Sequence, residues 1–307
     1  MLSRFAALAI TVLAAPVTFG QAPSEPGVVR VLRFTRTDTV QGFQEIATVI
    51  RTIADVRQLT VDTAPRALAL RGTADQIALA QWLFIELDVR AGGQSPSARS
   101  QSSGTHEYRV PSTSDDVTRV FFLSQTDTAR GIQAIAVAIR TVAEIQRLFI
   151  CTAPRALALR GTASQIGLAE WLIKKLDKPA DGQPPARQNQ DAPTEEYRMP
   201  GSSEIVRVIY TAHTDTAQDS QQIVTAIRVI GEIQRILLCP EQKALALRGT
   251  ADQIALAGWL FNELDKPATE QPIAQESPGV HDYRVPANGD EVRGVHVSDA
   301  RTAQSVQ

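Results

Sequence analysis

The side chains that could carry out chemistry are few, and their spacing matches no common catalytic or metal-binding pattern. None of the four histidines stands near another histidine or a cysteine at metal-ligand spacing. These histidines are His106, His213, His281 and His296. The sequence also lacks a nucleophile elbow, a P-loop and a dinucleotide-binding fingerprint. We therefore predict no catalytic residue, no metal, no cofactor and no enzymatic activity.

The two cysteines occupy equivalent places in a repeated sequence. Cys151 and Cys239 each stand five residues before a copy of ALALRG, where another copy has Asp62. A disulfide requires Cα atoms within about 7 Å of each other, and equivalent positions in neighbouring modules rarely lie that close. We interpret both residues as partly buried thiols on strands. A disulfide or a reactive thiol is the alternative.

Two polar patterns have ordinary structural explanations. The Arg-Gly-Thr turn at 160–162 precedes a predicted helix, as anion-binding loops do. Strand end, turn and helix cap explain the same three residues, so we favour that interpretation. Glu144 and Glu232 recur, with Asp55 nearby in the first copy, on the polar side of a helix end. An acid–base pair needs carboxyl groups in unlike environments, so we expect these to form a solvated face.

One segment of the sequence occurs three times. Residues 67–76 read ALALRGTADQ, residues 156–165 read ALALRGTASQ, and residues 244–253 read ALALRGTADQ. Upstream, EYRVP at 107–111 recurs as EYRMP at 196–200 and as DYRVP at 282–286. A tandem array of one module usually makes a surface, a spacer or a polymer rather than a single active cleft.

Three sets of residues recur at equivalent positions and are our candidates for contacts between subunits. Arginines on the first predicted helix, and at the end of the ALALR strand, could meet acidic residues of a neighbouring subunit. Tryptophans on the second predicted helix could contact the next module, since tryptophan is enriched at interfaces. The alternatives are solubility and ion pairing for the arginines, and core packing for the tryptophans. The candidates are Arg51, Arg140, Arg228, Arg71, Arg160, Arg248, Trp82, Trp171 and Trp259.

The hydrophobic period within a module changes in a fixed order. In the second module, alternation at 117–123 predicts a strand, and residues 128–145 have apolar positions at helical spacing. Asp127 or Thr128 is a suitable N-cap for that helix. Two short strands then flank a Pro-Arg turn, and a capping box at 162–165 begins a second helix. Each module is therefore predicted to be β-α-β-β-α.

We predict an α+β protein of three tandem modules joined by flexible linkers rich in Gly, Ser, Pro and Gln. Two helices should cover one face of a three-stranded sheet, which leaves its other face and its edges for other contacts. A fourth module is cut short, and its tail should be disordered or pair with another chain. The predicted ranges are signal peptide 1–20, modules 28–88, 107–177 and 196–265, linkers 89–106, 178–195 and 266–281, and truncated fourth module 282–307.

Composition and the first residues favour an exported protein. Arg4 precedes a nearly unbroken apolar run from Phe5 to Val17, and the small residues Thr18 and Gly20 follow on either side of Phe19, as in a secretory signal peptide. The run is too short to span a membrane comfortably, and we expect no transmembrane segment after cleavage. A net charge of −2 gives no reason to expect a nucleic-acid partner. We expect a periplasmic or outer-membrane-associated protein.

The ordered motifs of the module resemble those of the periplasmic N-domains of bacterial secretins, which are also described as ring-building motifs. The residues that carry the resemblance are Val208-Ile209-Tyr210, Pro154-Arg155, Arg160-Gly161-Thr162 with Gln165, and Leu176-Asp177. The resemblance covers the three modules and implies packing into rings and protein partners in a secretion or pilus system. The chain has no long glycine-rich region that could form a secretin channel.

Two functions of different class follow from these patterns. The first is a non-catalytic envelope protein whose repeats mediate protein–protein contacts or ring-type self-assembly, with protein partners that include itself. The alternative is a periplasmic repeat protein that binds a cell-wall or carbohydrate ligand in a groove lined by aromatic residues. Aromatic residues make up only 5% of the chain, which favours the first function.

Overall fold

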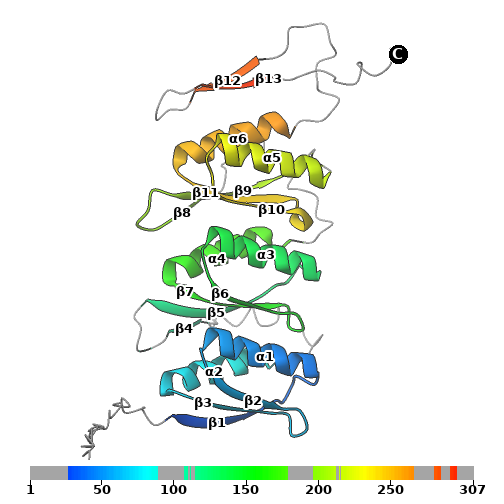
Figure 1. Cartoon of the computed structure of the whole chain (residues 1–307), viewed down its shortest axis with the longest axis vertical. Coiled ribbons are helices and arrows are strands. Elements are labelled where there is room, and N and C mark those ends of the chain that lie inside the picture. Colours follow the sequence, from blue (N-terminus) through cyan, green and yellow to red (C-terminus); the bar gives the residue numbers. More distant parts are fainter. Residues whose placement is uncertain are drawn as a thin grey trace, which may run out of the picture.

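The computed structural model describes residues 27–88, 107–109, 111, 115–178, 196–211, 214, 216–265, 280–284 and 291–295. These residues form three α+β modules stacked one above the other, with a β-hairpin above the third module (Figure 1). The predicted signal peptide and nearly all of the three predicted linkers lie outside the described residues.

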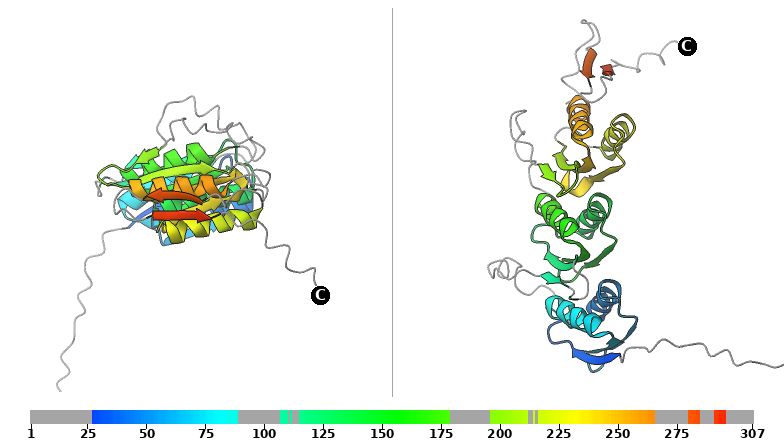
Figure 2. Two further views of the ribbon diagram at one scale, coloured as in Figure 1. Left: turned by 90° about the horizontal axis from the view of Figure 1, so that it is seen from above. Right: turned by 90° about the vertical axis from the view of Figure 1, so that its left-hand side faces the viewer.

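Module 1 has the predicted order of elements. It contains β1 (Val28–Arg33), α1 (Val40–Ile53), β2 (Gln58–Asp62), β3 (Ala67–Gly72) and α2 (Ala74–Leu87). The three strands form an antiparallel sheet in the order β1-β3-β2. Both helices lie on one face of this sheet (Figure 2). The ALALRG segment is therefore the central strand.

Modules 2 and 3 repeat this plan but have four strands instead of the predicted three. Module 2 comprises β4 (Glu107–Arg109), β5 (Asp116–Phe122), α3 (Ala129–Val142), β6 (Arg147–Cys151), β7 (Ala156–Thr162) and α4 (Ala163–Leu176). Module 3 comprises β8 (Glu196–Arg198), β9 (Ile205–Tyr210), α5 (Ala217–Ile230), β10 (Arg235–Cys239), β11 (Ala244–Gly249) and α6 (Ala251–Leu264). The extra strands are the EYR segments, which pair with the edges of β5 and β9. Three residues are too few for their alternation to predict a strand.

The predicted capping boxes are present at the start of α2, α4 and α6. In module 2, Thr162 accepts from the backbone N–H of Gln165, and the Gln165 side chain accepts from the backbone N–H of Thr162. The amide nitrogen of Gln165 also donates to the carbonyl of Glu144, 3.1 Å away. Glu144 has a left-handed backbone with φ of 56° just after α3. The glutamine thus joins the end of the first helix to the start of the second.

The modules stack because the central strand is apolar on both faces. In β7, Leu157 and Leu159 point into the core of module 2, whereas Ala156 and Ala158 belong to the core cluster of module 1. All four side chains are fully buried. The small alanines let the helices of the preceding module approach closely, so each helix layer covers the next sheet (Figure 2). The face that we expected to remain open is covered in modules 2 and 3.

The described part of the predicted fourth module is a hairpin of β12 (Val280–Arg284) and β13 (Glu291–Val295). It lies on the helical side of module 3, where Tyr283 and Val292 pack against that module's core (Figure 1). We expected disorder or pairing with another chain, and that expectation was wrong for these residues. The DYR segment supplies the second strand, and α6 supplies the apolar surface that a lone strand lacks. Residues 285–290 and 296–307 of the predicted fourth module lie outside the described residues.

Among the described residues, no helix is both long and apolar enough to cross a membrane.

The end of α2 is tied to the start of the module by one carboxylate. Asp88 accepts backbone N–H groups from Thr35 and Thr37, each at 2.8 Å, and also the Thr35 hydroxyl. Burial alone would raise the pKa of Asp88, but the hydrogen bonds from Thr37 and Thr35 outweigh it and hold the pKa below 3.8. Because the folded-state pKa is depressed, this stabilisation is present above the unfolded pKa. It is lost as pH falls through the folded pKa.

Replacing Asp88 with Asn should lower the free energy of unfolding of module 1 by about 2 kcal/mol at pH 7, because charge-assisted hydrogen bonds are lost. The difference from the wild type should shrink as pH falls below about 4. Hydrogen exchange of α2 peptides in urea, measured from pH 7 to pH 3, checks both. Asp62→Asn is the control, since Asp62 is exposed on the same module. A gap that stays constant over this pH range would contradict the explanation.

Candidate protein-interaction surface

The contact between modules 1 and 2 is organised by an arginine at the end of the ALALR strand. Arg160 donates from Nη1 to the carbonyl of Ile53, at the last residue of α1, over 2.9 Å. Its Nη2 atom lies 2.8 Å from a carboxylate oxygen of Asp116 in its own module. Thr152, in the β6–β7 turn, donates its backbone N–H and its hydroxyl to Glu45 on α1. The carbonyls at a helix C-terminus carry partial negative charge, so a guanidinium is favourable there.

The contact between modules 2 and 3 repeats this arrangement. Arg248 donates from Nη1 to the carbonyl of Val142, 3.0 Å away at the end of α3. It also pairs with Glu144 at 3.3 Å and with Glu204 of its own module. Arg235 joins the same two carboxylates, at 2.8 and 2.6 Å. Arg248 is only 9% exposed, whereas the side chains of Arg235 and Glu144 are 37% and 44% exposed, so water and salt reach the outer part of this network.

The recurring tryptophans lie at these contacts rather than deep in the module cores. Each is half-buried, and its ring packs at a tilt against the tyrosine ring of the following EYR or DYR segment. The pairs are Trp82 with Tyr108, Trp171 with Tyr197, and Trp259 with Tyr283, at centroid distances of 5.7, 5.8 and 5.4 Å. Within the described chain, the tryptophans therefore contact the next repeat, one of the two roles that we expected.

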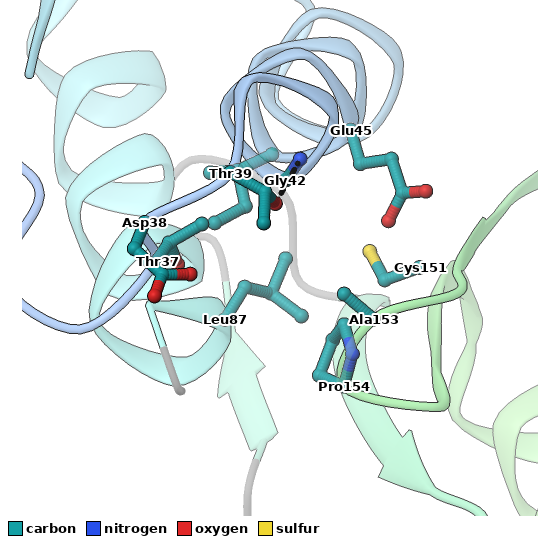
Figure 3. A pocket seen from close by; sticks show the side chains of 10 residues that line it. Thr37, Asp38, Thr39, Gly42, Glu45, Leu87, Cys151, Ala153 and Pro154 are labelled. Atoms are coloured by element: carbon teal, nitrogen blue, oxygen red, sulfur yellow. Dashed lines mark hydrogen bonds between the residues drawn. The ribbon is translucent and has the colours of Figure 1, made fainter. Parts of the chain in front are cut away.

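Both cysteines are free thiols, fully buried where a hairpin meets the helix of the preceding module. Burial raises the pKa of the Cys239 thiol to about 12, and burial together with the nearby Glu45 raises that of Cys151 well above its ordinary value. Figure 3 shows Cys151 facing Glu45 across a small cavity of about 10 Å³. That volume holds at most one water molecule. The cavity is therefore a packing gap in the contact between the modules, and the thiols are apolar filling.

The arginines of the first helices have a different role from those of the strand ends. Arg140 donates to the carbonyl of Leu148 over 3.0 Å, and Arg228 donates to that of Ile236 over 3.5 Å, each within its own module. Arg51 is exposed on α1. Of the candidate arginines, Arg160 and Arg248 are thus used for stacking within the chain. Arg71 is exposed.

One end of the stack leaves a sheet uncovered, and we call it the sheet end. It is the outer face of the module 1 sheet, formed by Val29, Val31, Asp62, Ala69 and Arg71. Val31 is 55% exposed, whereas its equivalents Val120 and Val208 are 2% and 6% exposed. The sheet end is the same kind of surface that modules 2 and 3 bury on the preceding helices.

The other end leaves a helix uncovered, and we call it the helix end. It is formed by Gln222, Ala226, Val229 and Ile230 of α5, with Glu232 just beyond. Ile230 is 43% exposed, whereas its equivalents Ile53 and Val142 are fully buried under the next module. This face of α5 is open and largely apolar between Gln218 and Ile230. The helix end is therefore the same kind of surface that α1 and α3 bury under a hairpin.

Both ends present apolar side chains whose equivalents inside the chain are buried. Within the described residues, no group of three His, Cys, Asp or Glu side chains is placed to hold a metal ion. Sheet and helix faces that recur in buried form inside the chain suit association with another layer of secondary structure. In ALALRG, every position before the arginine is apolar, and alanine alternates with leucine. This pattern was the sequence signal for burial of the strand on both faces.

Comparisons with known proteins give a weak likeness to several solved structures. No protein-family model matches the chain, and no curated protein matches it. The N-terminal domain of the secretin XcpQ from Pseudomonas aeruginosa is 14% identical, over 78% of this chain and 100% of that one, with a TM-score of 0.25. Aeromonas hydrophila ExeD is 12% identical, over 79% of this chain and 42% of that one, with a TM-score of 0.19.

A structure of a different kind is as similar. Dim2p from Pyrococcus horikoshii OT3 is 13% identical, over 49% of this chain and 91% of that one, with a TM-score of 0.26. Scores this low carry no inference about function. The argument about function therefore rests on the two ends of the stack and on the contacts that they repeat.

The three strand-end arginines allow a matched test of the stacking contact. Replacing Arg248 with Ala should lower the free energy of unfolding of module 3 by about 2 kcal/mol, because the charge-assisted hydrogen bonds to the Val142 carbonyl and to Glu204 are lost. Replacing the exposed Arg71 with Ala should change stability by less than about 0.5 kcal/mol. Urea unfolding followed by hydrogen exchange measures both, with α3 and β11 peptides for Arg248 and with α1 and β3 peptides for Arg71. Equal effects of the two substitutions would contradict the role assigned to Arg248.

Proposed function

We propose that this protein is a non-catalytic scaffold of the cell envelope that binds other proteins through the two ends of its module stack. One observation carries the proposal: a single sheet-on-helix contact is used twice inside the chain and leaves one half exposed at each end, with the hairpin β12–β13 over only part of the helix end. The exposed Val31 and Ile230 have equivalents that are buried in every internal contact. Such uncovered apolar surface commonly marks a protein-binding site.

The placement in the cell envelope rests on the sequence. The apolar run from Phe5 to Val17 after Arg4 is that of a secretory signal peptide. The motif order of secretin N-domains supports a role beside a secretion or pilus system, where ring-type self-assembly is one form that the contacts could take. Membership of such a system is part of the proposal.

The internal stack also bears on the alternative of a carbohydrate-binding protein. Sugar-binding grooves use exposed aromatic faces, and in this chain the rings of Trp82, Trp171 and Trp259 stack on tyrosines of the next repeat. The aromatic surface is thereby engaged in protein contact. We therefore favour protein partners over a saccharide ligand.

The proposal is tested by capturing partners from an envelope extract with the tagged mature protein. A double variant, Val31→Glu with Val229→Glu, places a charge on each end and should abolish specific capture. The control is Ile85→Glu, because Ile85 is 61% exposed on α2 and outside both ends as defined. It should capture as the wild type does.

Three results would count against the proposal. They are capture of no protein above background, equal capture by the end variant, or recovery of the tagged protein in the cytoplasmic fraction. Circular dichroism of each variant shows whether its fold is intact.

A further inference from the structure

We propose that two copies of this chain join head to tail, with the sheet end of one copy on the helix end of the other. The hairpin β12–β13 then acts as a cap that holds part of that site. This inference rests on the proposed function and names the partner as a second copy. Its warrant is continuity with the internal contact, since the partner surfaces are those that the chain already joins twice.

The first matched contact is that of Arg71. Its equivalents Arg160 and Arg248 each reach the carbonyl at the end of the preceding first helix. Each also binds a carboxylate in its own module, Asp116 or Glu204. Module 1 has Gly27 at that position, and Arg71 forms no hydrogen bond or ion pair with a described residue. Arg71 is thus an exposed guanidinium without the acidic partner of its equivalents.

The helix end has the same two acceptors for Arg71 that the internal contact has for Arg248, namely a carbonyl at the end of a helix and a nearby glutamate. In module 2, Arg248 meets the carbonyl of Val142 and the carboxylate of Glu144. The equivalent positions in module 3 are Ile230 and Glu232, and both side chains are exposed. Glu232 shares the left-handed backbone of Glu144, with φ of 52° against 56°. Its Cα–Cβ bond therefore leaves the helix end in the same direction as that of Glu144, and its exposed carboxylate is within side-chain reach of Arg71 of a second copy docked in this way.

The second matched contact joins Asp62 to Gln222. Inside the chain, the hairpin turn of module 2 lies on Glu45 of α1, which accepts from Thr152 beside Cys151. The sheet end has Asp62 in the place of Cys151, and a glutamate opposite it would repel it. The helix end has Gln222 in the place of Glu45. A glutamine amide can donate a hydrogen bond to a carboxylate, so the substitutions on the two ends are complementary.

The hairpin β12–β13 occupies part of this site. The register of β13 on β12 matches that of β9 on β8, since Arg293 faces Asp282 as Arg207 faces Glu196. By the same register, β13 is equivalent to β1. The two strands would therefore take the same place over α6, and docking of a second copy requires the hairpin to move.

The cap is held less firmly than a complete module. Tyr283 stacks on Trp259, and Val292 packs on the module 3 core. The next inward position holds Gly294, whereas β5 and β9 place Val120 and Val208 there. A glycine contributes no side chain to the contact. The hairpin therefore covers α6 while leaving α5 open, and a second copy that covers both helices can displace it.

A contact between two different faces does not close on itself. Each added copy presents a new sheet end or a new helix end, so association of this type produces linear chains of copies rather than a dimer. Ordinary caps prevent this in repeat proteins by making the terminal faces polar. Here the hairpin performs that task, and its release sets the length of the assembly.

The test uses the full mature chain with a weakened cap. Tyr283→Asp removes the stack on Trp259 and should make the weight-average mass, measured by light scattering, rise with concentration. Adding Arg71→Glu or Glu232→Arg singly should weaken association about 100-fold, because like charges then face each other. Adding Arg30→Glu should have no effect, since Arg30 lies on the other face of β1 from Val29 and Val31.

Mixing the two charge-reversed proteins separates this contact from a general loss of binding. In an equimolar mixture, the sheet end altered by Arg71→Glu meets the helix end altered by Glu232→Arg, so opposite charges face each other again. Each protein keeps its other end native, and those two native ends also match. The mixture should therefore assemble although neither protein does so alone.

A monomeric Tyr283→Asp variant at all concentrations would overturn the inference, as would a mixture that stays monomeric. If envelope capture still depends on the two ends in that case, the scaffold function stands and only the second copy as partner fails.

Discussion

The structure depends on a central strand that is apolar on both of its faces. In ALALRG, the leucines face the helices of their own module, and the alanines face the helices of the module before. Neither layer is complete alone, because a sheet with two apolar faces must be covered twice. Alanine is the size that permits this, since a larger side chain would hold the incoming helices away. The repeat is therefore a stack in which each unit finishes the core of its neighbour, as in solenoid proteins.

Polar contacts then set the register of the stack. An arginine at the end of the central strand can reach a helix C-terminus in only one alignment of sheet over helix. Arg160 and Arg248 make this contact in the same way, and Glu144 is held toward Arg248 by a left-handed turn that Gln165 fixes. Apolar surface supplies most of the driving force, and the guanidinium selects one alignment among many that would bury similar area.

Local sequence predicted the elements well and their assembly poorly. The capping box at Thr162 and Gln165, the hairpin and both helices follow from residues within one turn of each other. The stacking of each sheet on the helices of the preceding module could not be predicted in this way. It joins residues about 100 positions apart in sequence, such as Arg160 and Ile53. One signal was present. A strand in which alternate positions are Leu and Ala, without a polar face, indicates burial on both sides, and we interpreted it only as a strand.

The two ends of the stack differ from its inner contacts in a consistent way. Inner contacts place Cys151 and Cys239, both apolar and fully buried, where the sheet end has Asp62. On the helix side, the inner contacts have Glu45 or Ala134, which are half-buried. The equivalent residue at the helix end is Gln222, which is exposed. A contact that includes Asp62 and Gln222 buries less apolar surface than an inner contact does. It is therefore weaker and can dissociate. The inner contacts thus place a buried cysteine beside Glu45 or Ala134, while the ends keep enough valine and isoleucine to bind and enough polarity to dissociate. The same module therefore serves for permanent stacking inside the chain and for reversible binding at its ends. A few side chains at equivalent positions decide which of the two occurs.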